Sequence, residues 1–227
     1  MAQVWHDLLF AHWPIAVDVM RAAVPAGLEL DTYDGRAWLG VVPFRMSGVR
    51  LRCTPPLPRI SAFPELNVRT YVRLDDRPGV YFFSLDARNP IAVSIARAWF
   101  HLPYFRARMS CEREGERIVY RHARTHSGAR AGELRGSYGP HGPVFRATSG
   151  TLEHFLVERY CLYAAARSGD LFRADIHHPP WPLQLGEAAF DRNTIAAASG
   201  FDLPSSAPLL HFSRRQDVVV WNPRSVR

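Results

Sequence analysis

The chain of 227 residues contains no lysine, because all 28 of its Lys and Arg positions are arginine. A guanidinium group stays protonated and is not a practical nucleophile. The protein therefore has no side-chain primary amine, and catalysis through a lysine Schiff base is excluded.

Cysteine is scarce as well, and the three cysteines, Cys53, Cys111 and Cys161, lie far apart. Their odd number and the absence of a C-x-x-C motif argue against a disulfide framework and against a thiolate zinc site. We expect them to be buried free thiols.

Long apolar runs are also missing. The longest, such as residues 218–221, are far too short to span a bilayer. The N-terminal segment has an acid and no basic cluster, which is not the pattern of a signal peptide. The sequence therefore predicts a cytoplasmic protein without a membrane partner.

The motifs of several large enzyme classes are absent: there is no G-x-S-x-G, P-loop, H-E-x-x-H or dinucleotide-binding fingerprint. His177 and His178 are adjacent, and because neighbours on a strand point to opposite faces, only one can face a site. No acidic or histidine partner stands nearby at metal-ligand spacing, so we expect no metal and no cofactor. His178 is predicted to line a pocket or to pack, and His12 to be a core histidine.

The formal charge of +7 raises the question of a nucleic-acid partner. Residues 106–135 hold eight arginines and four glutamates, a local excess of +4. Aromatic side chains are not interleaved among them as in a platform that stacks bases. We therefore expect a solvated hairpin face and no nucleic acid, with nucleic-acid binding as a minor alternative.

Alternating apolar and polar residues predict about a dozen short strands and three or four short helices in one domain spanning residues 1–227. The pattern indicates an α+β fold of mostly antiparallel strands that packs two sheets or closes on itself. The principal predicted strands are 5–12, 63–74, 79–88, 104–113 and 116–125. The predicted helices cover 14–23, 90–101 and a short segment from Thr151, and hairpin turns are predicted at 34–35, 168–170 and 214–216.

The most informative stretch is residues 63–72, FPELNVRTYV, in which Glu65, Asn67, Arg69 and Tyr71 share one face of a strand. This row is either a solvated outer face or the polar wall of a pocket. In a pocket, the carboxylate and the guanidinium would pair or share a ligand.

A second candidate site lies at residues 96–107, ARAWFHLPYFRA. Arg97 stands among apolar residues of the predicted helix, either as a snorkelling surface residue or as a pocket cation. The chain then turns at Pro103 and presents Tyr104.

Six stretches in order, LLFAHWPI, YDGRAWLGVVPF, FPELNVRTYV, GVYFFSLDA, ARAWFHLPYFRARM and IHHPPWPLQ, resemble the YqjF-like family of unknown function over nearly the whole chain. That family is similar to the acetoacetate decarboxylase superfamily. The resemblance implies a β-rich α+β fold, an acetoacetate decarboxylase-like conical β-barrel with a few short helices around a small-molecule pocket, and possible homo-oligomers.

The resemblance also implies site residues. The decarboxylases carry Gly-Arg-Glu followed by Phe-Pro-Lys or Tyr-Pro-Lys, and Ala96-Arg97-Ala98 and Leu102-Pro103-Tyr104 stand at these places here. Tyr104 thus occupies the position of the catalytic lysine, and Glu65 matches an upstream strand glutamate that lines the pocket. This departure speaks against decarboxylation through an imine.

Two functions stay open. As an enzyme, the protein would use Tyr104 as acid or hydrogen-bond donor, Glu65 as base, and Arg69 or Arg97 to bind a carboxylate or enolate. Lyase, hydratase or isomerase chemistry on a small oxo-acid would suit these groups. As a non-catalytic binding or sensing module, it would hold a small anionic ligand in the same pocket. The remaining predicted ligand-binding residues are Asn67, Tyr71 and His178.

Overall fold

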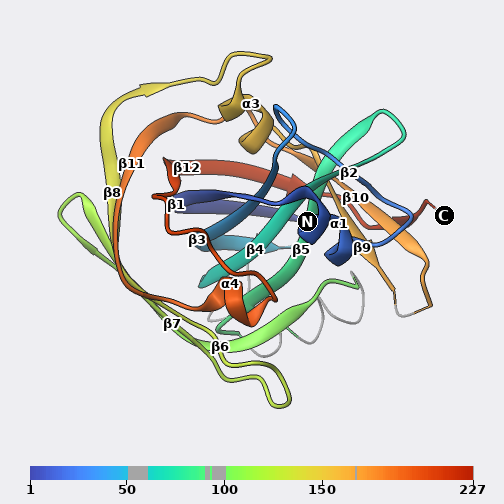
Figure 1. Cartoon of the computed structure of the whole chain (residues 1–227). Coiled ribbons are helices and arrows are strands. Elements are labelled where there is room, and N and C mark those ends of the chain that lie inside the picture. The colour runs from blue at the N-terminus through green and yellow to red at the C-terminus, as the bar shows by residue number, and fades with distance from the viewer. Residues whose placement is uncertain (51–60, 90–92, 94–100, 167, 227) are drawn as a thin grey trace.

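The computed structural model describes residues 1–50, 61–89, 93, 101–166 and 168–226 (Figure 1). The strands are β1 (Ala2–Ile15), β2 (Glu29–Leu30), β3 (Ala37–Arg50), β4 (Phe63–Leu74), β5 (Arg77–Ala87), β6 (Tyr104–Glu114), β7 (Arg117–Arg124), β8 (Glu133–Phe145), β9 (Cys161–Ala165), β10 (Leu171–His177), β11 (Leu183–Asn193), β12 (Leu209–Val220) and β13 (Arg224–Ser225). The helices are α1 (Val17–Ala23), α3 (Leu152–Val157) and α4 (Ile195–Ala198).

The thirteen strands of the described residues form one sheet that returns on itself twice. β5 pairs with β4, β6 and β9, and β12 pairs with β1, β10 and β11. One closed path, the seven-strand ring, runs β4-β3-β1-β12-β10-β9-β5. The other, the nine-strand ring, runs β5-β6-β7-β8-β11-β12-β1-β3-β4. The two rings share β12, β1, β3, β4 and β5 as a common wall, so the fold is a pair of rings rather than one simple barrel.

The central part of the common wall is buried on both faces, since residues 7–13 of β1, 37–44 of β3 and 63–72 of β4 are all buried. Successive side chains of a strand point to opposite faces. On β1, Leu8 and Phe10 pack into one apolar cluster inside the seven-strand ring. Leu9 and Ala11 pack into a second cluster inside the nine-strand ring. Each ring therefore has its own core, and the face of a wall residue decides which interior it enters.

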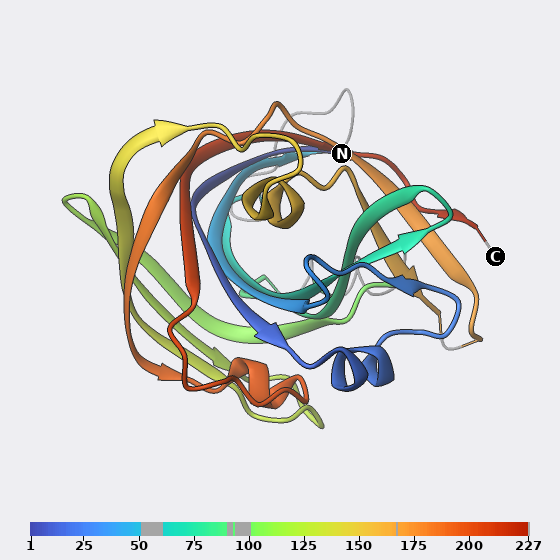
Figure 2. The same ribbon diagram turned by 45° about the horizontal axis from the view of Figure 1, so that its top comes forward.

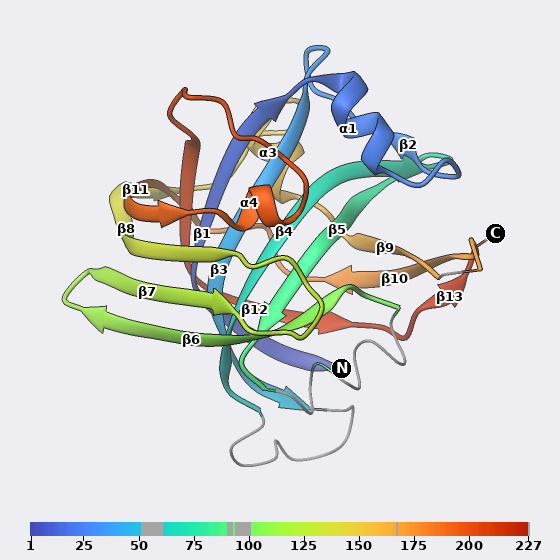
Figure 3. The ribbon, with the colours of Figure 1, turned by 60° about the horizontal axis from the view of Figure 1, so that its bottom comes forward.

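Helix α3 lies inside the seven-strand ring, encircled by the curved strands β1, β3 and β4 (Figure 2). Its Leu156 and Val157 are buried in that ring's core. Helix α4 belongs to the other core, where Ile195 is fully buried. Figure 3 shows β6, β7 and β8 at one side of the molecule and β9, β10 and β13 at the other. Among the described residues, no helix has the length and apolar character needed to cross a bilayer.

The N-terminus of α3 is capped by Thr151, the residue near which the sequence predicts the helix to begin. The Thr151 hydroxyl accepts a hydrogen bond from the backbone N–H of His154 at 3.3 Å. We expect Thr151→Ala to lower the free energy of unfolding by about 1 kcal/mol, because it removes this cap. Urea denaturation measures the change, with Ser205→Ala in an exposed loop as the control. Equal stability of the two variants would contradict the assigned cap.

Most predicted elements are confirmed, and the strand predicted at 63–74 matches β4 at both ends. The hairpin predicted at 214–216 is wrong, because β12 continues through it as one strand that pairs with β1 from Val219 to Leu209. At Asp34 and Gly35, with φ of 48° and 70°, the predicted turn forms, but β2 pairs with β4 instead of β3. The sequence reading missed β11. The helix predicted at 90–101 lies almost entirely outside the described residues.

Candidate active site

The polar row of β4 faces the interior of the seven-strand ring. Glu65, Asn67, Arg69 and Tyr71 are all buried, with exposed fractions between 0% and 8%. Tyr71 belongs to the apolar cluster inside this ring. The alternative of a solvated outer face is therefore wrong, and the row forms an internal polar wall.

Tyr104 meets this wall at Glu65. Its hydroxyl donates a hydrogen bond to the Glu65 carboxyl at 3.0 Å. Tyr104 begins β6 opposite Leu85 of β5, and the backbone N–H of Leu85 donates to the carbonyl of Pro103 at 3.0 Å. On the other side, the Tyr120 hydroxyl donates to the backbone carbonyl of Glu65 at 2.7 Å. The turn at Pro103 therefore places Tyr104 on the same face as Glu65, across the intervening strand β5.

Both groups of this pair hold their protons at neutral pH. Burial raises the pKa of Glu65 from 4.5 to about 8, opposed by the hydrogen bond from Tyr104 and increased by the nearby charge of Asp86. Burial, with the charge and the hydrogen bond of Glu65, raises the pKa of Tyr104 well above its usual value. Two adjacent titratable groups with displaced pKa values are typical of a proton-transfer site.

A second polar group lies further along β4, beneath α3. The Tyr71 hydroxyl donates to the carbonyl of Leu156 at 2.8 Å and contacts His12 Nε2 at 2.6 Å. The Arg69 guanidinium donates to the same carbonyl at 3.2 Å. Gly40 leaves room for both neighbours, since a Cβ there would lie 3.1 Å from His12 Nε2 and 3.3 Å from Arg69 Cγ. The C-terminal end of α3 thus closes this end of the polar wall.

One predicted site residue, His178, has its contacts away from the Tyr104–Glu65 pair. The ring nitrogens of His178 lie 2.9 Å from the carbonyl of Pro179 and 3.3 Å from that of Arg159, and the ring stacks on Tyr160. This matches the packing role predicted as one option for His178. Arg97 lies outside the described residues. Among the residues that are described, no three His, Cys, Asp or Glu side chains could share a metal ion.

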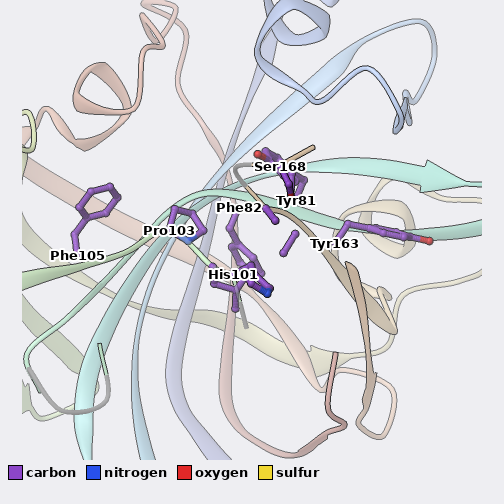
Figure 4. Close-up of a pocket in the computed structure, with 11 residues that line it drawn as sticks. Tyr81, Phe82, His101, Pro103, Phe105, Tyr163 and Ser168 are labelled. Atoms are coloured by element: carbon purple, nitrogen blue, oxygen red, sulfur yellow. The ribbon is translucent and has the colours of Figure 1, made fainter. Parts of the chain in front are cut away.

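A pocket of about 600 Å³ lies where β6 and β9 diverge along β5 (Figure 4). Pro103, directly before Tyr104, is part of its wall, and His101 stacks on Phe172 with ring centroids 4.5 Å apart. The cavity therefore opens beside the turn that carries Tyr104. Its lining residues are Tyr81, Phe82, His101, Leu102, Pro103, Phe105, Tyr163, Ala164, Ala165, Ala166 and Ser168.

Comparison with known proteins places the chain in a family. The model of DUF2071, described as an uncharacterised conserved protein, matches residues 2–217. The chain belongs to the DUF2071 family. The protein YqjF of Bacillus subtilis (strain 168), described as uncharacterised, is 48% identical to this DUF2071 protein over 221 residues, which cover 97% of this chain and 90% of YqjF. The predicted resemblance to the YqjF-like family is confirmed.

Solved structures show the same fold as this DUF2071 protein. Acetoacetate decarboxylase from Legionella pneumophila gives a TM-score of 0.65 at 11% identity, covering 100% of this chain and 88% of that chain. The enduracididine biosynthesis enzyme MppR complexed with pyruvate also gives 0.65, at 13% identity, covering 100% and 90%. The acetoacetate decarboxylase-like fold is therefore confirmed.

The sequence reading missed one buried polar group of the DUF2071 protein. This group lies on the face of β5 that is turned away from Glu65. Asp86 accepts two hydrogen bonds from Arg124 at 2.8 Å each and contacts His122 Nε2 at 2.8 Å. The prediction of a solvated face is wrong for Arg124, whose side chain is 2% exposed. A signal exists in the sequence, because His122 and Arg124 continue the alternate positions of Ile118 and Tyr120, which form the apolar face of β7.

Proposed function

We propose that this DUF2071 protein binds a small oxo-acid in the seven-strand ring and catalyses proton transfer on it, without a covalent imine. The observation that carries this proposal is the 3.0 Å hydrogen bond between Tyr104 and Glu65, buried at the polar wall. The reaction class is that of a lyase, hydratase or isomerase. Support from the fold is that MppR, of similar structure, is complexed with pyruvate, an oxo-acid.

The roles follow from the chemistry of the two groups. Ionised Glu65 takes the proton from the carbon next to the substrate carbonyl, and its raised pKa makes it a stronger base than an exposed carboxylate. The electron pair of that C–H bond forms a C=C bond, and the π pair of the carbonyl moves to its oxygen, which gives the enolate. The Tyr104 hydroxyl turns from Glu65 and donates its hydrogen bond to the enolate oxygen that develops. Arg69, Asn67 and Tyr71 line the same interior for an anionic substrate.

Exchange of carbon-bound hydrogen for deuterium in D₂O tests this proposal. We expect the protein to accelerate exchange in at least one of pyruvate, acetoacetate and levulinate, measured by proton NMR. Tyr104→Phe should slow the exchange about a hundredfold while the fold is retained, because it removes only the hydroxyl. Tyr33→Phe is a matched control, since the Tyr33 hydroxyl bonds the carbonyl of Gly150 at the surface. Wild-type exchange rates in Tyr104→Phe would rule out the assigned role.

A second candidate function is ligand binding without turnover. Its support is that Glu65 holds its proton at neutral pH and so accepts no proton there. It predicts that these oxo-acids raise the melting temperature although none exchanges deuterium. The exchange experiment therefore separates the two functions.

A further inference from the structure

Arg69 differs from the other buried arginines of the described residues. Arg124 bonds the carboxylate of Asp86 at 2.8 Å, and Arg159 that of Asp31 at 2.6 Å. Arg69 is 8% exposed, yet no carboxylate of the described residues pairs with it, and its Nε has no hydrogen-bond partner there. An unpaired buried charge is strongly unfavourable. The described residues therefore supply no counter-charge for Arg69.

Other polar atoms in the same ring are also left without partners. The Tyr71 hydroxyl can donate either to the carbonyl of Leu156 or to His12 Nε2. In both cases His12 Nδ1 remains unmatched, as a bare acceptor or as an unused donor. The unpartnered inward atoms of the described residues are His12 Nδ1, Trp38 Nε1, Asn67 Oδ1, Arg69 Nε, Trp181 Nε1 and His211 Nδ1.

We infer that Arg69 binds the carboxylate of the ligand, as the anion-binding end of a site whose reactive end is Tyr104 and Glu65. This deepens the proposed function and rests on it for the position of the reacting carbon. The planar guanidinium suits a carboxylate, which it can bind through parallel hydrogen bonds.

The charge balance favours a monoanion over a phosphate. Burial and the charge of Arg69 lower the pKa of His12 well below its usual value, and burial lowers that of His211, opposed by Glu153. Both histidines are therefore neutral at pH 7, as is protonated Glu65. Among the described residues of this group, Arg69 then contributes a single positive charge, which one carboxylate neutralises and which a phosphate dianion would exceed.

The spacing along β4 adds a length requirement. Glu65 and Arg69 are four residues apart on one face, so their Cα atoms are separated by about 13 Å. The Arg69 guanidinium lies over the rings of Phe10 and Tyr71 and bonds Leu156, which holds it at its own end. The ligand therefore carries its carboxylate several bonds away from the reacting carbon, as levulinate does and pyruvate does not.

The experiment compares hexanoate with hexanol as probes of the whole chain by titration calorimetry. We expect the wild type to bind hexanoate more tightly than acetate, and not to bind hexanol. Arg69→Met should weaken hexanoate binding about tenfold or more, because the charged hydrogen bonds are lost. Its melting temperature without ligand should be unchanged or higher, because the unpaired buried charge is gone. Arg121→Met, at an exposed position of β7, should bind as the wild type does.

Arg69→Lys is the second variant. It keeps the positive charge but lacks the paired N–H donors of the guanidinium, so it should also bind hexanoate more weakly. Tyr104→Phe separates this inference from the proposed function, because it should lose deuterium exchange and keep hexanoate binding. The inference is overturned if the wild type does not bind hexanoate, or if both Arg69 variants bind hexanoate as tightly as the wild type does. Either result holds whatever the exchange rates are.

Discussion

Replacing Asp86 with alanine is expected to lower the free energy of unfolding by about 3–5 kcal/mol, because it leaves a buried guanidinium without its counter-charge. Asp86 is 0% exposed and accepts hydrogen bonds from Arg124 Nε and Nη2, with His122 as a third contact. Once the carboxylate is gone, the Arg124 guanidinium stays buried without an acceptor for these hydrogen bonds. Urea denaturation gives the change, provided that the dependence on urea concentration keeps the same slope.

Two comparisons isolate the buried pair. Asp217→Asn breaks the exposed pair with Arg215, whose side chains are 64% and 60% exposed, and should cost at most about 1 kcal/mol. The double change Asp86→Leu with Arg124→Met removes both charges and should recover much of the lost stability. If Asp86→Ala costs no more than Asp217→Asn, the ion pair does not stabilise the wall of the nine-strand ring. The loss of this negative charge should also lower the pKa of Glu65.

The local pattern of the sequence predicts much of the site, and non-local pairing decides the rest. Alternation in residues 63–72 correctly places Glu65, Asn67, Arg69 and Tyr71 on one face of β4. It cannot say whether that face looks outward, because this depends on β3 and β5 as neighbours and on the closure of the ring through β12 and β10. The resemblance to decarboxylases, and not periodicity, implies that Tyr104 and Glu65 share a pocket, and their hydrogen bond is seen only in the structure.

The wrong hairpin in β12 has a similar cause. Arg214, Arg215 and Gln216 look like turn residues in isolation. In the structure, β1 offers a continuous partner along this segment, and Arg214 bonds Asp7 at 3.0 Å and Glu116 at 2.6 Å. Contacts with distant strands therefore satisfy polar residues that a local pattern assigns to a loop.

The pH dependence of stability should show the buried carboxyl of Glu65 directly. The ordinary pKa of a glutamate side chain is 4.5, and the pKa of Glu65 in the folded protein is about 8. Between these values the unfolded chain has lost the proton that the folded chain keeps, so rising pH favours unfolding. The raised pKa of Glu65 contributes on the order of 5 kcal/mol to the free energy of unfolding. This contribution is complete below pH 4.5 and is lost as the pH rises to 8. Glu65→Gln does not titrate. The free energy of unfolding of Glu65→Gln minus that of the wild type should therefore be larger at pH 9 than at pH 4.5.

Urea denaturation of both proteins from pH 4.5 to 9 measures this difference, in which the other titrating groups largely cancel. Glu114→Gln, at an exposed position, should change stability by at most about 0.5 kcal/mol. Parallel pH profiles for the wild type and Glu65→Gln would show that Glu65 is not a buried acid.

The same proton links stability to the proposed chemistry. Glu65 becomes a base only when it ionises. The exchange rate of an oxo-acid should therefore rise with pH, and the midpoint of this rise should lie at about pH 8. Glu65→Gln should lose both this rise and the exchange itself. The wild type is then most active in the pH range where its fold has lost the stabilisation by the protonated carboxyl. A ligand whose binding lowers the pKa of Glu65 would move both transitions to lower pH together, because one proton controls them.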